Sequence, residues 1–351
     1  MTERVELAPG YPVSRNINGM WQLSEGHRSD DVDPQQAVRT MLELVDAGLT
    51  TFDCADIYLG VEELLGRLLR EMRDAHRDPA AIQIHTKFVP DRSALGSLSR
   101  SDVTRAVEAS LARLGVERLD LVQFHWWDWD QPGFIEVAGW LTDLRDEGKI
   151  RCLGTTNFDT PHLGKLLQAG IPIVTNQAQY SLLDRRVDDA MKGLCRVHET
   201  RLLCYGVLAG GFLGDRYFGA GEPEPPFINR SLTKYRLIIE DFGGWGLLQD
   251  LLAVLDAIAR RHGASIAVIA TRWVLDRDPV AAVMIGARST AHLEDNLSVF
   301  STRLDAEDRS RIEEVLRSAK GPIGDPFELE REPEGRHSDI MWTDLNSTRR
   351  P

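Results

Sequence analysis

Short apolar runs alternate with amphipathic segments along most of the chain. The runs, such as "TTFDCA" and "IQIHTKF", are continuous and of strand length, which is typical of strands buried on both faces of a parallel sheet. The segments between them repeat their apolar residues at helical spacing. In the first such segment these residues are Val38, Met41, Leu42 and Val45. Asp33 as N-cap, Pro34 at the first helical position and Gly48 as stop delimit this predicted helix.

The alternation predicts eight strand–helix units in order. The predicted strands are 16–21, 50–55, 82–88, 119–125, 151–157, 173–179, 201–207 and 280–286. The predicted helices are 33–48, 61–72, 101–115, 134–149, 161–170, 186–199, 247–263, 266–278, 290–300 and 306–319. Alternating units imply parallel strands with helical crossovers, and eight strands close a (β/α)₈ TIM barrel. We therefore predict an α/β fold with one domain over 1–351, interrupted by a long irregular insertion at 208–246 and extended by a polar tail at 320–351.

Composition narrows the class of protein. The formal net charge of −13 disfavours binding to the phosphate backbone of nucleic acid. No apolar stretch approaches the ~20 residues of a membrane span, and the first residues do not resemble a signal peptide. The four cysteines form no C-x-x-C pair and the nine histidines do not cluster, so we expect no disulfide framework and no metal. A reducing cytoplasm is the expected location, and nothing in the sequence indicates an oligomeric state.

Barrel enzymes carry their chemistry at the carboxyl ends of the strands. Here Asp53 ends the second predicted strand, with Tyr58 in the loop behind it, Lys87 ends the third and His125 ends the fourth. Each side chain alone has a structural explanation: a helix cap, a core phenol, an ion-paired ammonium or a buried imidazole. Four reactive groups at consecutive strand ends instead favour a shared catalytic site.

The chemistry of these four groups explains their combination. A free phenol has a pKa of about 10, and a neighbouring ammonium lowers it. We expect Asp53 to hold Lys87, Lys87 to tune Tyr58, and His125 to orient a carbonyl and share the proton. The product is a general acid for a carbonyl oxygen.

Several motifs resemble those of the aldo-keto reductase family, in the family's order and from about Arg15 to Ala319: "FDCADIY", "HTK", "LDLVQFHW", "GKIRCLGTTNF", "TNQAQY" and "IGARSTAHLEDN". The resemblance implies a (β/α)₈ barrel and NADPH-dependent reduction of an aldehyde or ketone, reversible toward alcohol or sugar dehydrogenation. It assigns Tyr58 as proton donor, with Asp53, Lys87 and His125 completing the catalytic set.

The resemblance also assigns residues to NADP(H). Those implied near the nicotinamide and pyrophosphate are Thr156, Asn157, Gln177, Tyr205, Gly206 and Leu208. Thr156 stands where the family usually has serine, and Gly206 removes a side-chain hydroxyl, so its contact would be through the backbone. Those implied near the adenosine end are Arg288, Ser289, His292 and Asn296. Arg288 suits a 2′-phosphate because guanidinium binds phosphate bidentately, whereas His292 departs from the family's usual Arg or Gln. No G-x-G-x-x-G follows the first strand, which argues against a Rossmann site.

The predicted substrate pocket is aromatic. Trp21 and Trp126 match family positions that line it, and Trp127 and Trp129 add aromatic surface or pack in the core. Such walls suit a bulky, ring-bearing or sugar-like carbonyl or alcohol. The rival interpretation is a redox-sensing NADP(H)-binding accessory subunit with little turnover, as some family relatives are.

Two segments outside the strand–helix rhythm have functional interpretations. The 208–246 insertion is too long for an ordinary connection and is predicted to be a lid over the cofactor. The tail after residue 319 is either disordered or returns across the barrel mouth.

Overall fold

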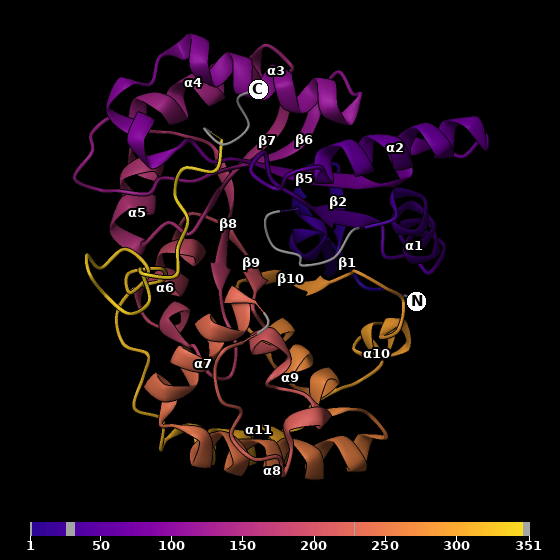
Figure 1. Cartoon of the computed structure of the whole chain (residues 1–351), viewed down its shortest axis with the longest axis vertical. Coiled ribbons are helices and arrows are strands. Elements are labelled where there is room, and N and C mark those ends of the chain that lie inside the picture. Colours follow the sequence, from indigo (N-terminus) through magenta and orange to yellow (C-terminus); the bar gives the residue numbers. More distant parts are fainter. Residues whose placement is uncertain (1, 26–31, 228, 347–351) are drawn as a thin grey trace.

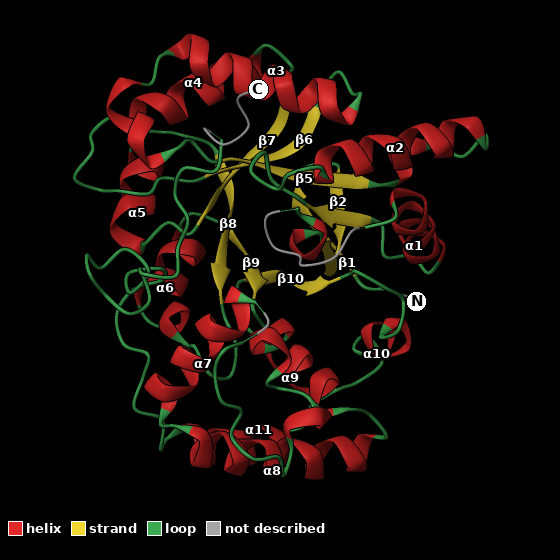
Figure 2. Ribbon diagram, viewed as in Figure 1, coloured by secondary structure: helices red, strands yellow, loops and turns green. Residues whose placement is uncertain are grey.

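A computed structural model describes residues 2–25, 32–227 and 229–346. Eight parallel strands form a closed barrel, in the order β10-β3-β4-β5-β6-β7-β8-β9. The strands are β3 (Asn16–Gly19), β4 (Thr51–Asp53), β5 (Gln83–Phe88), β6 (Leu119–Phe124), β7 (Ile150–Thr156), β8 (Ile173–Gln179), β9 (Arg201–Tyr205) and β10 (Val280–Gly286). Figure 2 shows the strands at the centre and the helices around them. The predicted (β/α)₈ barrel is confirmed.

Apart from α7, which the sequence did not predict, the helices lie close to where the sequence places them. They are α1 (Pro34–Asp46), α2 (Val61–Asp74), α3 (Arg100–Leu114), α4 (Phe134–Asp146), α5 (Thr160–Gln168), α6 (Ala190–Val197), α7 (Arg230–Phe242), α8 (Trp245–His262), α9 (Ile266–Leu275), α10 (Leu293–Ser298) and α11 (Ala306–Leu316). Asp33 caps α1 as predicted, because its carboxylate accepts from Gln35 N at 2.9 Å. Gly115 caps the end of α3. Its φ of 66° lies in the left-handed region, which glycine adopts readily because it has no Cβ.

The first strand-like elements are a hairpin that the sequence reading missed. β1 (Arg4–Ala8) and β2 (Tyr11–Ser14) pair antiparallel. Tyr11 and Val13 are buried against Ile17, Leu121 and Leu203 of the barrel strands. The hairpin therefore covers apolar strand residues at this end of the barrel and shields them from water. The opposite end of the barrel is left for the chemistry.

The 208–246 segment is more regular than predicted. Two 3-10 turns, at Ala209–Gly211 and Asp215–Tyr217, lead to α7. α7 buries Ile238, Ile239 and Phe242 in the main core. The prediction of an irregular stretch was wrong because this apolar stripe makes α7 an integral part of the outer layer.

The tail returns across the carboxyl ends of the strands (yellow in Figure 1). Of the two predicted alternatives, disorder or a return across the barrel mouth, its described part follows the second. Asp325 accepts from Thr160 N at 2.8 Å at the start of α5. Farther along, Arg331 bonds carbonyl oxygens after β6 and β7, and Asn346 donates to Val89 O after β5. Residues 347–351 of the predicted tail lie outside the described residues.

No single helix within the described ranges is long and apolar enough to cross a membrane, although α7 and α8, bent by 92° at their junction, pass the same test as a pair. Among the described residues, no three or more His, Cys, Asp or Glu side chains gather as metal ligands would. All four cysteines are free and buried.

Candidate active site

The four residues predicted at the strand ends do meet. The Lys87 ammonium lies 2.5 Å from an Asp53 carboxylate oxygen, and both side chains are 5% exposed. Lys87 also donates to Cys54 O at 2.8 Å and lies 4.9 Å from the centroid of the Tyr58 ring. Parallel register explains the meeting, because Asp53 pairs with His85, two residues before Lys87, and Lys87 pairs with Gln123, two residues before His125.

The second carboxylate oxygen of Asp53 accepts hydrogen bonds from two side-chain amides. The sequence did not indicate either of them as a partner of Asp53. Gln123 Nε2 and Gln177 Nε2 both donate to Asp53 Oδ1, at 2.8 and 2.7 Å. Gln177 also donates to Gln123 Oε1 at 2.7 Å. The carboxylate thus accepts from an ammonium and two amides inside the barrel, which fixes its orientation and, through it, that of Lys87.

Tyr58 remains a phenol. Burial raises the pKa of Tyr58, and this effect outweighs the opposing influence of Lys87. The sequence-based expectation of a lowered pKa was wrong in its net sign, because the loss of solvent around the ring is a tertiary effect. Burial alone would lower the pKa of Lys87, but the Asp53 carboxylate reverses this and raises it. The site therefore holds a protonated phenol beside a charged ammonium, which is a proton donor with its charge stabiliser.

His125 is neutral and has a defined tautomer. Its Nδ1 lies 3.0 Å from Thr156 O, and a carbonyl oxygen can only accept, so Nδ1 carries the proton. Burial, followed by the charge of Arg331, lowers the pKa of His125 to about 3. Nε2 is buried without a hydrogen-bond partner in the described part of the chain. In the neutral ring this atom is an acceptor, available to a hydroxyl.

The four predicted pocket tryptophans divide into two pairs. Trp21 lies in a 3-10 turn after β3, not in the strand as predicted, with its ring centroid 4.7 Å from that of Tyr58. Trp127 lies edge-on to His125 at 4.3 Å. Trp126 is fully buried against Phe124, and Trp129 stacks on His162 at 3.9 Å. Trp21 and Trp127 thus flank the reactive groups, whereas Trp126 and Trp129 pack behind them.

The residues predicted for the nicotinamide half of the cofactor lie together at the ends of β7, β8 and β9. Tyr205 donates to Asn157 Oδ1 at 2.9 Å, and Thr156 and Gln177 are paired in register on adjacent strands. Gly206 has φ of 70°, and a Cβ there would lie 2.4 Å from the Tyr235 hydroxyl of α7. Glycine is therefore required at this position by both the backbone and α7. Leu208 packs against the main core.

The residues predicted for the adenosine half are separate and mostly exposed. Arg288, Ser289 and His292 are exposed in the turn between β10 and α10, and Asn296 is half-buried in α10. An exposed guanidinium beside a serine in a turn suits a phosphate that approaches from solvent. Together with the amides near Tyr205, this donor set fits an extended dinucleotide phosphate.

Three tail residues complete the mouth of the barrel, and the sequence reading did not single them out. Phe327 lies edge-on to His125, with ring centroids 5.7 Å apart. Glu330 is fully buried between Lys234 of α7 at 3.1 Å and Arg186 at 3.2 Å. Arg331 lies over the rings of Trp129 and Phe327. The only sequence signal for them was an aromatic residue followed closely by charged residues in an otherwise unpatterned tail.

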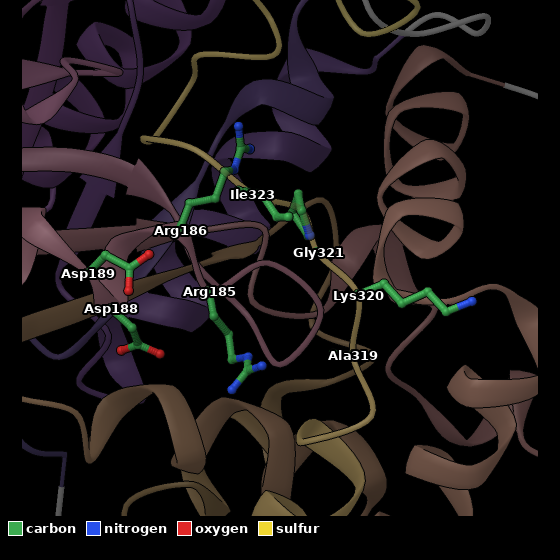
Figure 3. A pocket seen from close by; sticks show the side chains of 9 residues that line it. Arg185, Arg186, Asp188, Asp189, Ala319, Lys320, Gly321 and Ile323 are labelled. Atoms are coloured by element: carbon green, nitrogen blue, oxygen red, sulfur yellow. The ribbon is translucent and has the colours of Figure 1, made fainter.

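A cavity of about 260 Å³ lies at the base of the tail (Figure 3), and none of the four reactive residues lines it. It lies between the loop after β8 and the segment leaving α11. Its lining residues are Arg185, Arg186, Asp188, Asp189, Ala319, Lys320, Gly321, Pro322 and Ile323. Arg186 is engaged by Asp184 and Glu330, so its charge is not free to bind a ligand in this cavity.

Comparisons with known proteins agree with this geometry. The family model described as "Aldo/keto reductase family" matches residues 17–317. The chain is 27% identical over 331 residues to aldo-keto reductase YhdN of Bacillus subtilis (strain 168), covering 91% of this chain and 95% of that protein. It is 25% identical over 330 residues to the NADH-specific methylglyoxal reductase of Escherichia coli (strain K12), covering 87% and 95%. The solved structure of the glycerol dehydrogenase AKR11B4 from Gluconobacter oxydans superposes with a TM-score of 0.73 at 28% identity, covering 90% of this chain and 95% of that one. This chain belongs to the aldo-keto reductase family.

Proposed function

We propose that this protein reduces an aldehyde or ketone to the alcohol with NADPH, and catalyses the reverse oxidation under suitable conditions. The observation that carries the proposal is the half-buried Tyr58 phenol beside the Lys87–Asp53 ion pair, with His125 Nε2, which has no hydrogen-bond partner among the described residues, at the next strand end. This set provides a proton donor, a charge that stabilises the developing phenolate and a hydrogen-bond acceptor.

Each side chain has a defined part in the reaction. The nicotinamide supplies a hydride to the carbonyl carbon when bound. Tyr58 transfers its hydroxyl proton to the carbonyl oxygen, and the phenolate that remains is stabilised by Lys87. The product hydroxyl donates to His125 Nε2. In the oxidation direction the phenolate form of Tyr58, stabilised by Lys87, accepts the proton of the alcohol, so the same groups serve both directions.

For the cofactor, Asn157 and Gln177 would hold the carboxamide, Tyr205 would stack on the nicotinamide and Arg288 would bind the 2′-phosphate. We expect Arg288 to set the preference for NADPH over NADH. This preference needs its own test, because one relative is named as NADH-specific. A charge-assisted contact contributes about 1.5–3 kcal/mol, or roughly ten- to a hundredfold in affinity. Arg288→Ala should weaken NADPH by that factor and leave NADH almost unchanged. Equal weakening of both would remove Arg288 from the phosphate site.

The substrate class follows from the walls of the site. Trp21 and Trp127 lie against the two reactive rings, and Phe327 adds a third aromatic surface. Flat aromatic surfaces favour a ring-bearing or sugar-like small molecule. We place the enzyme in the cytoplasm, where its four free cysteines would stay reduced. The relatives reported above carry the names of enzymes, so we do not propose the rival function of an accessory subunit.

Tyr58→Phe tests the proposal. Only the proton donor is lost, so turnover of an aromatic aldehyde should fall by at least about a hundredfold. NADPH affinity, measured by fluorescence titration, should stay within a factor of about two to three of the native value. Near-native turnover in this variant would exclude Tyr58 as the proton donor.

A further inference from the structure

Arg331 ties together the strand ends that carry two of the site residues. Its Nη2 donates to Trp126 O at 2.7 Å and to Asn157 O at 2.8 Å. Trp126 follows His125 at the end of β6, and Asn157 follows Thr156 at the end of β7. A single nitrogen from the tail therefore joins two neighbouring loops just beyond the last residues of β6 and β7.

The partly buried guanidinium makes no direct ion pair among the described residues, although the nearby carboxylates of Asp159 and Glu330 oppose the effect of burial on its pKa. It lies between two rings, 4.4 Å from the centroid of Trp129 and 4.9 Å from that of Phe327. Its Nε is buried and has no hydrogen-bond partner in the described part of the chain. Burial lowers the pKa of Arg331 to about 10. Burying a cation without a paired carboxylate is costly, and such groups concentrate at functional sites.

The backbone at Phe327 is strained in the same place. Phe327 has φ of 61°, which is unfavourable for a bulky side chain. Its ring contacts both the imidazole of His125 and the guanidinium of Arg331. Strain of this kind persists only where surrounding contacts enforce it. The contacts of Arg331 hold the tail in this conformation, next to His125.

We propose that Arg331 is a positioning residue of the active site, because its guanidinium fixes the two strand ends on which His125 and Asn157 are carried. This inference rests on the proposed function. Arg331 lies behind Phe327 and acts through the backbone, not through contact with substrate. The bonds at Trp126 O and Asn157 O hold the residues that directly follow His125 and Thr156. The hydrogen bond between His125 and Thr156 sets the tautomer of His125.

The charge of Arg331 also acts on His125 directly. Two cationic groups face the imidazole, Lys87 from β5 and Arg331 from the tail, and both disfavour its protonation. Burial acts in the same direction, and the Thr156 carbonyl opposes it. Arg331 therefore helps to keep Nε2 an acceptor, which is the state the reaction requires. Its removal should raise the pKa of His125, while burial still keeps that pKa below its ordinary value.

The test compares Arg331→Gln, Arg331→Lys and Arg331→Ala with Arg336→Gln. Arg336 is the matched control, because it lies on the same tail, is exposed and pairs with Glu240 and Asp241 of α7. Steady-state kinetics separate kcat from KM, and nitrogen NMR follows the His125 ring, identified through His125→Asn. The NMR titration does not depend on turnover, so it judges Arg331 even if the proposed reaction fails.

We expect Arg331→Gln to lower kcat roughly 10- to 100-fold with little change in KM, as small misplacements of reacting groups do. Its His125 ring should titrate at higher pH than in the native protein, whereas Arg331→Lys should keep the native titration. Guanidinium ion, below denaturing concentrations, should restore part of the kcat of Arg331→Ala. Arg336→Gln should change neither kcat nor titration. An unchanged His125 titration in Arg331→Gln, or equal kinetic losses in Arg331→Gln and Arg336→Gln, would overturn the proposal.

Discussion

Replacing Lys87 by methionine tests whether the ion pair under Tyr58 supports both the fold and the reaction. Lys87 and Asp53 are each 5% exposed and 2.5 Å apart, so removing the ammonium leaves a carboxylate buried without its counter-ion. Breaking such a pair costs about 3–5 kcal/mol. Asp53 keeps the two amide donors from Gln123 and Gln177. We therefore expect Lys87→Met to lower the free energy of unfolding by about 3 kcal/mol, the lower end of that range.

A double variant separates stability from catalysis. Asp53→Asn combined with Lys87→Met removes both charges, so no unpaired ion remains, and most of the lost stability should return. Turnover should be lost in both variants, because neither retains the ammonium that stabilises the phenolate of Tyr58. Urea denaturation gives the free energies of unfolding, and NADPH-dependent reduction of an aromatic aldehyde gives the activity.

Two results would refute this reasoning. If Lys87→Met unfolds at the native urea concentration, the Asp53 carboxylate is not destabilised by losing its partner. If the variant keeps its turnover, Lys87 does not stabilise the charge on Tyr58. Lys87→Arg offers a milder test, since the pH–rate profile should shift while the carboxylate remains paired.

Three further predictions concern pH, the tail and the lid. Burial, followed by the charge of Arg331, lowers the pKa of His125 to about 3, and burial lowers that of His85 to about 4 against the opposing charge of Asp53. The unfolded chain therefore takes up protons first, and stability should fall as pH drops below about 6.5, by roughly 1.4 kcal/mol per unit for each ring. His125→Asn should flatten that slope in urea titrations at several pH values, and an unchanged slope would contradict it. Glu330→Gln should cost about 3 kcal/mol by leaving Lys234 unpaired, whereas Glu332→Gln on the exposed part of the tail should cost less than about 0.5. Deleting residues 219–227, ahead of α7, should abolish a slow second step in stopped-flow NADPH binding; single-step binding by the native enzyme would leave the lid without support.

The barrel could be predicted because its signals are local. Continuous apolar runs mark strands buried on both faces, and Asp33, Pro34 and Gly115 mark helix ends through their own backbone preferences. Asp53 and Lys87 could be placed together because parallel strands bring their carboxyl ends to one edge. The β1–β2 hairpin and α7 were missed for the opposite reason, since each is defined by the surface it covers.

The sign of the Tyr58 pKa shift shows where sequence reasoning stops. The neighbouring ammonium could be inferred from spacing, and it does act to lower that pKa. The burial that outweighs it comes from contacts such as that of the ring with Trp21 and from packing against the main core, and no spacing in the sequence measures that burial. The magnitude of a desolvation effect is a property of the assembled structure, whereas the presence of a charge is a property of the chain.

The role of the tail follows from a physical requirement that the sequence states only in part. At the carboxyl ends of β6 and β7 the chain leaves the sheet, so the carbonyl oxygens of Trp126 and Asn157 have no strand partner and need a donor. Arg331 supplies it from 205 and 174 residues away. A sequence reader could know that some donor must cover these ends, but not which segment brings it. Among the described tail residues, Arg331 can serve because aromatic rings on both sides accept its planar cation. The same contacts that satisfy these two carbonyl oxygens also place a positive charge beside His125. Arg331 therefore both holds the strand ends and helps to lower the pKa of the imidazole.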